Sequence, residues 1–138
     1  MLSEDYIQIV NQELDRLLVY ETVFKEYTTT CHKLEIGNCY ASENFERLHD
    51  YFSRNVLRFN HFVAECYRIQ APAEYTGFNQ TLLTSLEAIK HAVSLMLMAI
   101  DVDGVNHTLY DSGLHEQARA HKALDAAFAA IGGTAQAM

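Results

Sequence analysis

Residues that interrupt secondary structure are scarce in this chain, and their positions divide it into four long stretches. The 138 residues include six glycines and one proline, which is too few for the turns of a many-stranded sandwich or barrel. The boundaries fall at Gly37-Asn38, Ala71-Pro72 and Asp101-Val102-Asp103-Gly104, and Gly132-Gly133 is expected to end the last stretch. Each stretch has roughly 30 residues, which would span about 45 Å as a helix.

These boundary residues suit the ends of helices. Glycine adopts the left-handed conformation that closes a helix without a Cβ penalty. Proline fits the first helical turn and disfavours helix in the residue before it. We therefore predict helices over residues 3–36, 42–70, 72–101 and 105–131, with Ser3 as the N-cap of the first.

Apolar residues in each stretch recur at steps of three and four, the spacing of one helix face. The first two stripes are Tyr6, Val10, Leu14, Leu17, Phe24 and Cys31, and then Phe45, Leu48, Phe52, Val56, Phe59, Val63 and Cys66. The third runs from Tyr75 through Leu82, Leu86, Ile89, Val93 and Met96 to Ile100, and the fourth contains Tyr110, Leu114, Ala118, Leu124, Phe128 and Ile131. The pattern predicts a single all-α domain, an antiparallel up-down-up-down four-helix bundle over residues 1–138.

Charge and composition narrow the classes of partner and compartment. Hydrophobic residues make up 49% of the chain, too many for disorder, and the formal charge is −8. A net negative charge argues against nucleic-acid and membrane partners. The acidic start at Glu4-Asp5 is unlike a secretory signal. The longest apolar run, 92–100, is interrupted by Ser94 and is shorter than the roughly 20 residues that span a bilayer. The three cysteines do not have the spacing of a disulfide framework. We expect a cytoplasmic protein with reduced thiols.

Residues 37–70 are the one neutral part of this acidic chain, with four basic and four acidic residues. Its outward face carries arginines that can hold an acidic partner or phosphate, or else form a solvated, salt-bridged surface in which Asp50 and Arg54 are a favourable pair. The residues of this face are Arg47, Tyr51, Arg54, Arg58, His61 and Arg68.

The third stretch carries more apolar surface than a bundle core requires. Leu95 and Met98 project away from its core stripe at 100° per residue. An exposed apolar patch is often an interface, although single surface hydrophobes are common. The sharper hypothesis is a homodimer through this helix.

The motifs of metal and nucleophilic sites are incomplete. Glu46-Arg47-Leu48-His49 supplies one Glu-x-x-His motif of a carboxylate-bridged bundle site, but a second is absent. Cys31, His32, Cys39 and His107 gather at one end without a standard zinc spacing. The chain has no nucleophile elbow, phosphate-cradling loop or dinucleotide fingerprint. We expect no enzyme activity, metal or cofactor.

The strongest candidate polar site lies on the inward faces of the first and fourth stretches. Glu21 falls on the apolar stripe of the first, where a carboxylate is costly unless paired. Counting from the connections at the same end places His121 in the same layer, so we predict a buried Glu21–His121 contact. It can serve as a polar pair that fixes helix register. Alternatively, these two residues line a small-molecule pocket together with His49, which also faces inward, and Tyr110.

Two features of the second half resemble a known class of protein. They are the run Ala71-Pro72-Ala73-Glu74-Tyr75 before a leucine-rich helix, and the alanine-rich last helix. This half resembles small helical-bundle proteins of unknown function that are common in Gram-positive bacteria. Such proteins often carry a histidine shortly after the proline-led turn, where this chain has Asn79. The resemblance implies a bundle and assigns no catalytic residues.

Two hypotheses about function follow. In the first, the bundle is non-enzymatic and acts through self-association, as a homodimer, or through a protein partner. In the second, it binds a small molecule or metal in a polar core pocket. A packed core with a buried apolar interface favours the first, and a cavity at the Glu21 layer favours the second.

Overall fold

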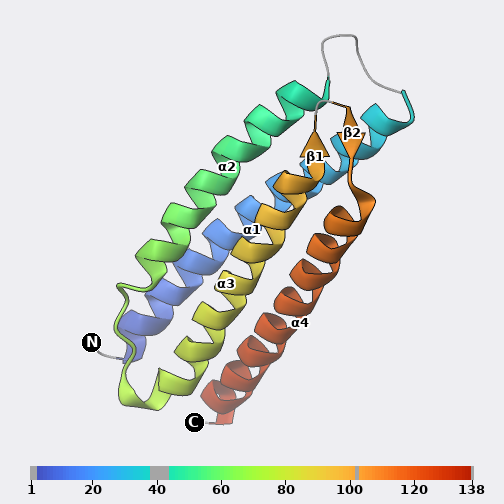
Figure 1. Ribbon diagram of the computed structural model, residues 1–138. Coiled ribbons are helices and arrows are strands. Elements are labelled where there is room, and N and C mark those ends of the chain that lie inside the picture. Colours follow the sequence, from blue (N-terminus) through green and yellow to red (C-terminus); the bar gives the residue numbers. More distant parts are fainter. Residues whose placement is uncertain (1–2, 38–43, 102, 138) are drawn as a thin grey trace.

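The chain forms four long helices that lie side by side, with a two-residue β-ladder between the last two. The computed structural model describes residues 3–37, 44–101 and 103–137, with side chains described as far as Ile131. The elements are α1 (Ser3–Glu35), α2 (Phe45–Cys66), the 3₁₀ turn η1 (Ala73–Tyr75), α3 (Thr76–Ala99), β1 (Ile100–Asp101), β2 (Gly104–Val105) and α4 (His107–Ala137). Chain direction reverses at each connection (Figure 1), which confirms the predicted up-down-up-down bundle.

The boundary residues act largely as their chemistry predicts. Gly37 follows α1 with a φ of +72°, and its N–H donates to the carbonyl of Leu34 at 3.2 Å. The second helix begins at Phe45 and not at residue 42, because extended Asn44 is its N-cap and accepts a hydrogen bond from the Arg47 N–H at 2.8 Å. Ser3 is the first residue of α1 and not its N-cap as predicted, and its hydroxyl donates to Glu74 of η1.

Several helix ends differ from the prediction. The second helix stops at Cys66, four residues early, and the third begins as η1 and gives way to β1 after Ala99. The fourth begins at His107, two residues late. The turn at 101–104 is a hairpin in which Ile100 pairs with Val105 and Asp101 with Gly104. The fourth helix runs through Gly132-Gly133 to Ala137. A glycine weakens a helix by about 1 kcal/mol relative to alanine, but without a left-handed turn it does not end one.

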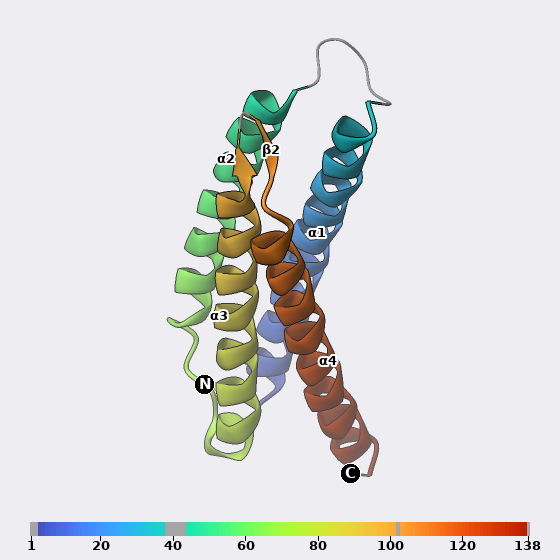
Figure 2. The same ribbon diagram turned by 45° about the vertical axis from the view of Figure 1, so that its right-hand side comes forward.

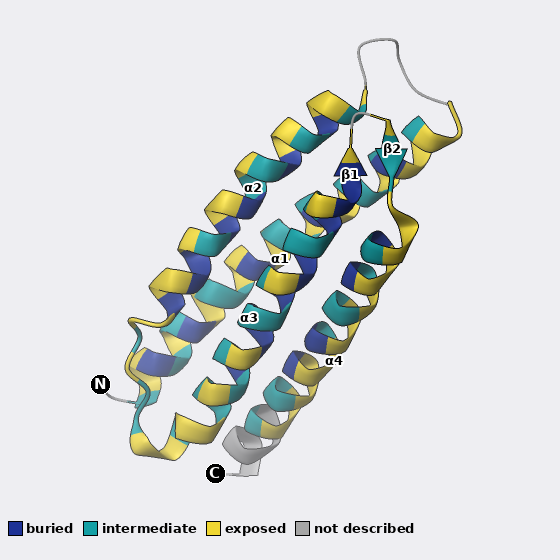
Figure 3. Cartoon of the chain, viewed as in Figure 1, coloured by how far each residue is buried: buried dark blue, intermediate teal, exposed yellow. Residues whose placement is uncertain are grey.

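The predicted stripes face the interior, as the dark inward surfaces in Figure 3 show, except that Ala118 of the fourth stripe is exposed. Aromatic rings fill the space between α1 and α2. Phe24 meets Phe52 and Phe59 edge-on at 5.8 and 5.4 Å between ring centroids, and Tyr20 lies 5.3 Å from Phe59. Edge-to-face pairs of this kind add about 0.5–1.5 kcal/mol to their burial. The α1–α2 pair is therefore closed by apolar packing.

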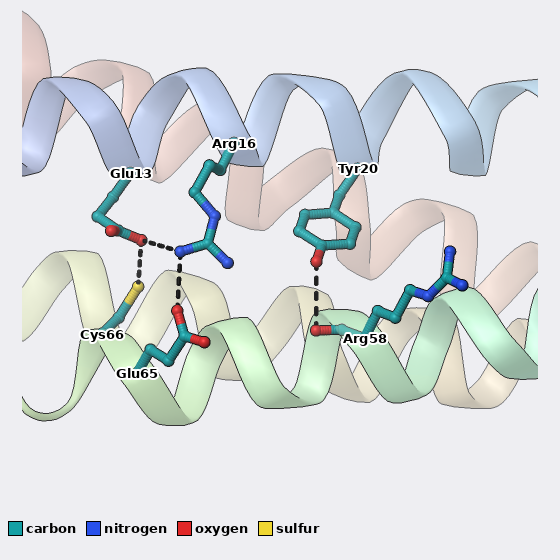
Figure 4. A network of polar contacts seen from close by, with 6 residues as sticks. All are labelled: Glu13, Arg16, Tyr20, Arg58, Glu65 and Cys66. Atoms are coloured by element: carbon teal, nitrogen blue, oxygen red, sulfur yellow. Dashed lines mark hydrogen bonds and ion pairs between the residues drawn. The ribbon is translucent and has the colours of Figure 1, made fainter.

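A polar network reinforces the same pair (Figure 4). Arg16 of α1 donates to Glu65 of α2 at 2.8 Å and lies over the ring of Phe62. The Cys66 thiol donates to Glu13 at 3.4 Å. Burial, together with this carboxylate, raises the pKa of Cys66 to about 12. The thiol is thus held protonated as a hydrogen-bond donor.

The closest helix pair in the bundle is α3–α4, and a buried glycine sets its spacing. A Cβ at Gly113 of α4 would lie 2.6 Å from Cγ of Met96 and 2.7 Å from the carbonyl oxygen of Ala92, both on α3. Real Cβ atoms do not approach other atoms so closely. Small α3 residues, Ser85, Ala92 and Ala99, are buried as well. The backbones consequently approach each other along this pair more than anywhere else in the described residues.

The α1–α4 pair, by contrast, makes hardly any close backbone approach within the described residues. Figure 2 shows these two helices crossing at an angle rather than following each other. The helix α4 packs closely on α3, and α1 packs on α2, but α1 and α4 are not closely packed against each other within the described residues. We call the boundary between α1 and α4 the α1–α4 seam.

The segment that contains η1 and α3 is long and apolar enough to cross a membrane, by length and composition alone. Within its most apolar window, 44% of the residues are buried inside the bundle. A helix at the centre of a bundle core has the same composition, since it is apolar on more than one face.

The close contact at Gly113 gives a test of the α3–α4 spacing. Gly113→Ala is expected to lower the free energy of unfolding by about 1–2 kcal/mol, because an overpacked core costs about 1–3 kcal/mol and alanine recovers part of it through helix propensity. Urea unfolding measures the change. Gly77→Ala is the matched control, because a Cβ at this α3 glycine meets nothing within 4 Å. Equal stability of the two variants would contradict the assigned packing.

Buried thiols predict a loss of stability in base. Burial raises the pKa of Cys31 to about 11 and of Cys66 to about 12, whereas an unperturbed thiol ionises near 9. The unfolded chain therefore gives up these protons first, and their contribution to stability is complete below pH 9 and lost as pH rises through 11–12. Urea unfolding should show a lower free energy at pH 10.5 than at pH 8, with a smaller drop in Cys66→Val. If Cys66→Val lost as much free energy of unfolding between pH 8 and pH 10.5 as the unmodified protein, ionisation of Cys66 would not be the cause.

Candidate functional site

Glu21 and His121 meet across the α1–α4 seam, as the sequence predicts. Nδ1 of His121 lies 2.8 Å from one carboxylate oxygen of Glu21 and 3.1 Å from the other. The contact is less buried than expected, with 16% of the Glu21 side chain and 41% of the His121 side chain exposed. The seam is too wide for helices in direct contact, so two long polar side chains span it and leave the histidine partly in solvent.

A second carboxylate completes the arrangement around His121. Nε2 of the ring lies 3.2 Å from Asp125, one turn further along α4. A neutral imidazole donates through only one of its nitrogens, whereas an imidazolium donates through both. The two flanking carboxylates contact both ring nitrogens and so hold the plane of the ring across the seam.

Two pockets open on either side of this contact, and both are lined by Glu21 and His121. The upper pocket, toward the hairpin end, has a volume of about 390 Å³. The lower pocket, toward the C-terminal end, has a volume of about 420 Å³. Residues lining the upper pocket are Glu21, Lys25, Thr28, Leu114, Gln117, Ala118 and His121. Those lining the lower pocket are Asn11, Leu14, Asp15, Leu17, Leu18, Glu21, His121, Leu124, Asp125 and Phe128.

A second glutamate–histidine contact crosses the seam above the first. Glu35 of α1 lies 2.5 Å from Nε2 of His107 of α4. Glu21 and Glu35 are 14 residues apart on one helix, and His107 and His121 are 14 apart on the other. Two heptads bring a residue back to nearly the same helix face, so the spacing repeats the contact in antiparallel register. Sequence reasoning missed this pair, although the equal spacing was visible.

Tyr110 does not reach either pocket, contrary to the second hypothesis. It is 5% exposed, and its hydroxyl donates to Thr28 Oγ1 at 3.1 Å. Burial raises the pKa of Tyr110 to about 12. Thr28 itself lines the upper pocket, so Tyr110 supports the wall from behind.

His49 is not part of the Glu21 layer. It lines a separate, smaller pocket of about 180 Å³ with Glu46, Asp50, Ile100 and Asp101, near the hairpin. The helical wheel placed His49 on the inward side correctly, since it is half-buried. It lies too near the start of α2 to reach residues halfway down α1.

The apolar patch expected on α3 is smaller than the sequence suggests. Met98 is 69% exposed, but Leu95 is half-buried.

On α2, Arg47 donates to the Tyr51 hydroxyl at 3.0 Å, and Arg47 and Arg54 both lie over the Tyr51 ring. This arginine face is exposed and engaged with its own helix.

No group of three or more histidine, cysteine, aspartate or glutamate side chains among the described residues could hold a metal ion. Of the residues expected near the first and third connections, Cys31 is buried and His107 pairs with Glu35. His32 is exposed. Cys39 lies outside the described residues.

Comparison with protein-family models, curated proteins and solved structures finds no match. Asn79 stands where the similar bacterial bundle proteins often carry a histidine. It accepts a hydrogen bond from the buried Tyr6 hydroxyl at 2.8 Å and so links α1 to α3.

The Glu21–His121 contact predicts a measurable coupling. A double-mutant cycle with Glu21→Gln and His121→Asn should give an interaction free energy of about 0.5–1 kcal/mol, because the pair is in contact but partly exposed. Urea unfolding of the unmodified protein, the two single variants and the double variant gives this interaction free energy. A cycle that pairs Glu21→Gln with His115→Asn, an exposed position on the same helix, should give none. Equal coupling in the two cycles would show that the contact adds nothing.

Proposed function

We propose that this protein is a non-enzymatic, small-molecule-binding four-helix bundle whose ligand lies in the α1–α4 seam beside Glu21 and His121. The observation behind the proposal is the pair of adjoining pockets, one on each side of this contact. Each has a volume within the range of about 300–1,000 Å³ that is typical of ligand sites.

The lining also suits a ligand with an apolar body and a polar group. Leu14, Leu17, Leu124 and Phe128 form apolar surface in the lower pocket. Carboxylate and imidazole groups stand at the junction of the pockets. Many apolar contacts with a few oriented polar groups are the usual composition of a small-molecule site.

Self-association through α3 is the second candidate, and exposed Met98 favours it. One methionine beside a half-buried Leu95 offers much less apolar area than the roughly 800 Å² per partner of a standard interface. Ligand binding in the seam is therefore the better supported function.

Occlusion of the upper pocket tests the proposal. Nile red, an uncharged apolar dye, should bind with enhanced fluorescence, and Ala118→Phe should weaken its binding about tenfold by filling the space between α1 and α4. Ala118 lines the upper pocket on its exposed rim, so the larger side chain leaves the core intact. Ala123→Phe is the matched control, since Ala123 is exposed on the same helix outside both pockets.

Two results would contradict the proposal. One is the absence of dye binding to the unmodified protein. The other is dye binding that neither Ala118→Phe in the upper pocket nor Asp125→Phe on the exposed rim of the lower pocket weakens relative to Ala123→Phe, which would place the dye away from the seam. Thermal unfolding of the three variants verifies that they are folded.

A further inference from the structure

The two pockets of the seam differ in charge. Three carboxylates line the lower pocket, those of Asp15, Glu21 and Asp125, and neither lysine nor arginine does. The upper pocket contains Lys25 with Glu21. His121 is common to both pockets.

Carboxylates in the lower pocket are only partly neutralised by the protein itself. His121 contacts Glu21 and Asp125. Asp15 makes no hydrogen bond or ion pair within the described part of the chain. Even a fully protonated His121 leaves the lining with excess negative charge, and the chain as a whole carries −8.

Beneath these carboxylates lies an apolar floor with an aromatic ring. Leu14 and Leu17 come from α1, and Leu124 and Phe128 come from α4. Phe128 is fixed by an edge-on contact with Phe78 of α3, with the ring centroids 5.0 Å apart. A ring held in this way offers, together with the leucines, a fixed apolar surface for the body of a ligand.

We infer that the lower pocket takes an organic cation with an apolar body, such as a hydrophobic amine or quaternary ammonium compound. Its charged head lies among Asp15, Glu21 and Asp125, and its body rests on the leucines and Phe128. A hydrophobic cation matches both parts of the lining, whereas an anion of the same shape would meet three carboxylates. The inference rests on the proposed function and specifies its class of ligand.

His121 competes with such a ligand for the same carboxylates. Each contact that the ring makes with Glu21 or Asp125 occupies a carboxylate that the head of the ligand would otherwise meet. Replacement by a shorter side chain, His121→Asn, removes these contacts, frees Glu21 and Asp125 for the ligand and should raise its affinity. A structural role for His121 alone would give the opposite result, because loss of the bridge would loosen the site.

Three probes with one apolar body and different heads test the inference. They are 4-phenylbutyltrimethylammonium, 4-phenyl-1-butanol and 4-phenylbutyrate, titrated into the full chain by calorimetry at low salt. The cation should bind at least tenfold more tightly than the alcohol, and the anion most weakly. High salt should reduce the advantage of the cation, because exposed charges are screened.

Variants then assign the effect to the lower pocket. Asp15→Asn with Asp125→Asn should weaken cation binding about tenfold and leave alcohol binding unchanged. Both positions are exposed, so the fold should persist. Asp111→Asn, an exposed carboxylate on α4 that lines neither pocket, is the control and should bind as the unmodified protein does.

Each outcome separates the two proposals. If the alcohol binds as tightly as the cation, or if Asp111→Asn matches the double variant, the cation inference fails while a ligand site in the seam survives. If none of the probes binds, the cation inference fails, and the Nile red result decides whether the seam binds anything. Tighter cation binding that is lost only in the double variant supports both.

Discussion

The close approach of α4 to α3 determines the shape of the rest of the bundle. At Gly113 the two backbones come so near that no side chain fits between them. On its other side, α4 makes hardly any close backbone approach to α1 within the described residues. On the far side of the bundle, aromatic rings and the Arg16–Glu65 contact hold α1 on α2. Two tight pairs result, and the α1–α4 seam between them stays open.

Polar side chains span the seam where apolar packing cannot. Glu21–His121 and Glu35–His107 each join α1 to α4, and Tyr110 joins α4 to Thr28. These contacts join the two helices without filling the volume between them, as a polar pair that fixes register would do. The unfilled volume forms the two pockets, which adjoin at Glu21 and His121. The same geometry thus explains both the structural pair and the candidate ligand site, which sequence reasoning treated as alternatives.

Helix period and residue chemistry were enough to predict the four helices and the Glu21–His121 layer. They could not predict how wide each helix–helix boundary would be, because width depends on which small residues face each other. Gly37, Gly113 and Gly132 illustrate the difficulty: the first ends a helix, the second permits close packing, and the third continues a helix. A pattern of apolar residues does not distinguish these roles. Tyr110 and His49 were wrongly expected in the Glu21 pocket for a related reason. A helical wheel gives the direction of a side chain but not which residues of the neighbouring helices it contacts.

The most direct test of the open seam is a two-dimensional amide NMR titration with 4-phenylbutyltrimethylammonium. The account predicts that shift changes concentrate on residues 11–21 of α1 and 121–128 of α4, which line the lower pocket, and that amides of α2 hardly move. Changes centred on α2, or on the outer face of α3 around Met98, would contradict the account.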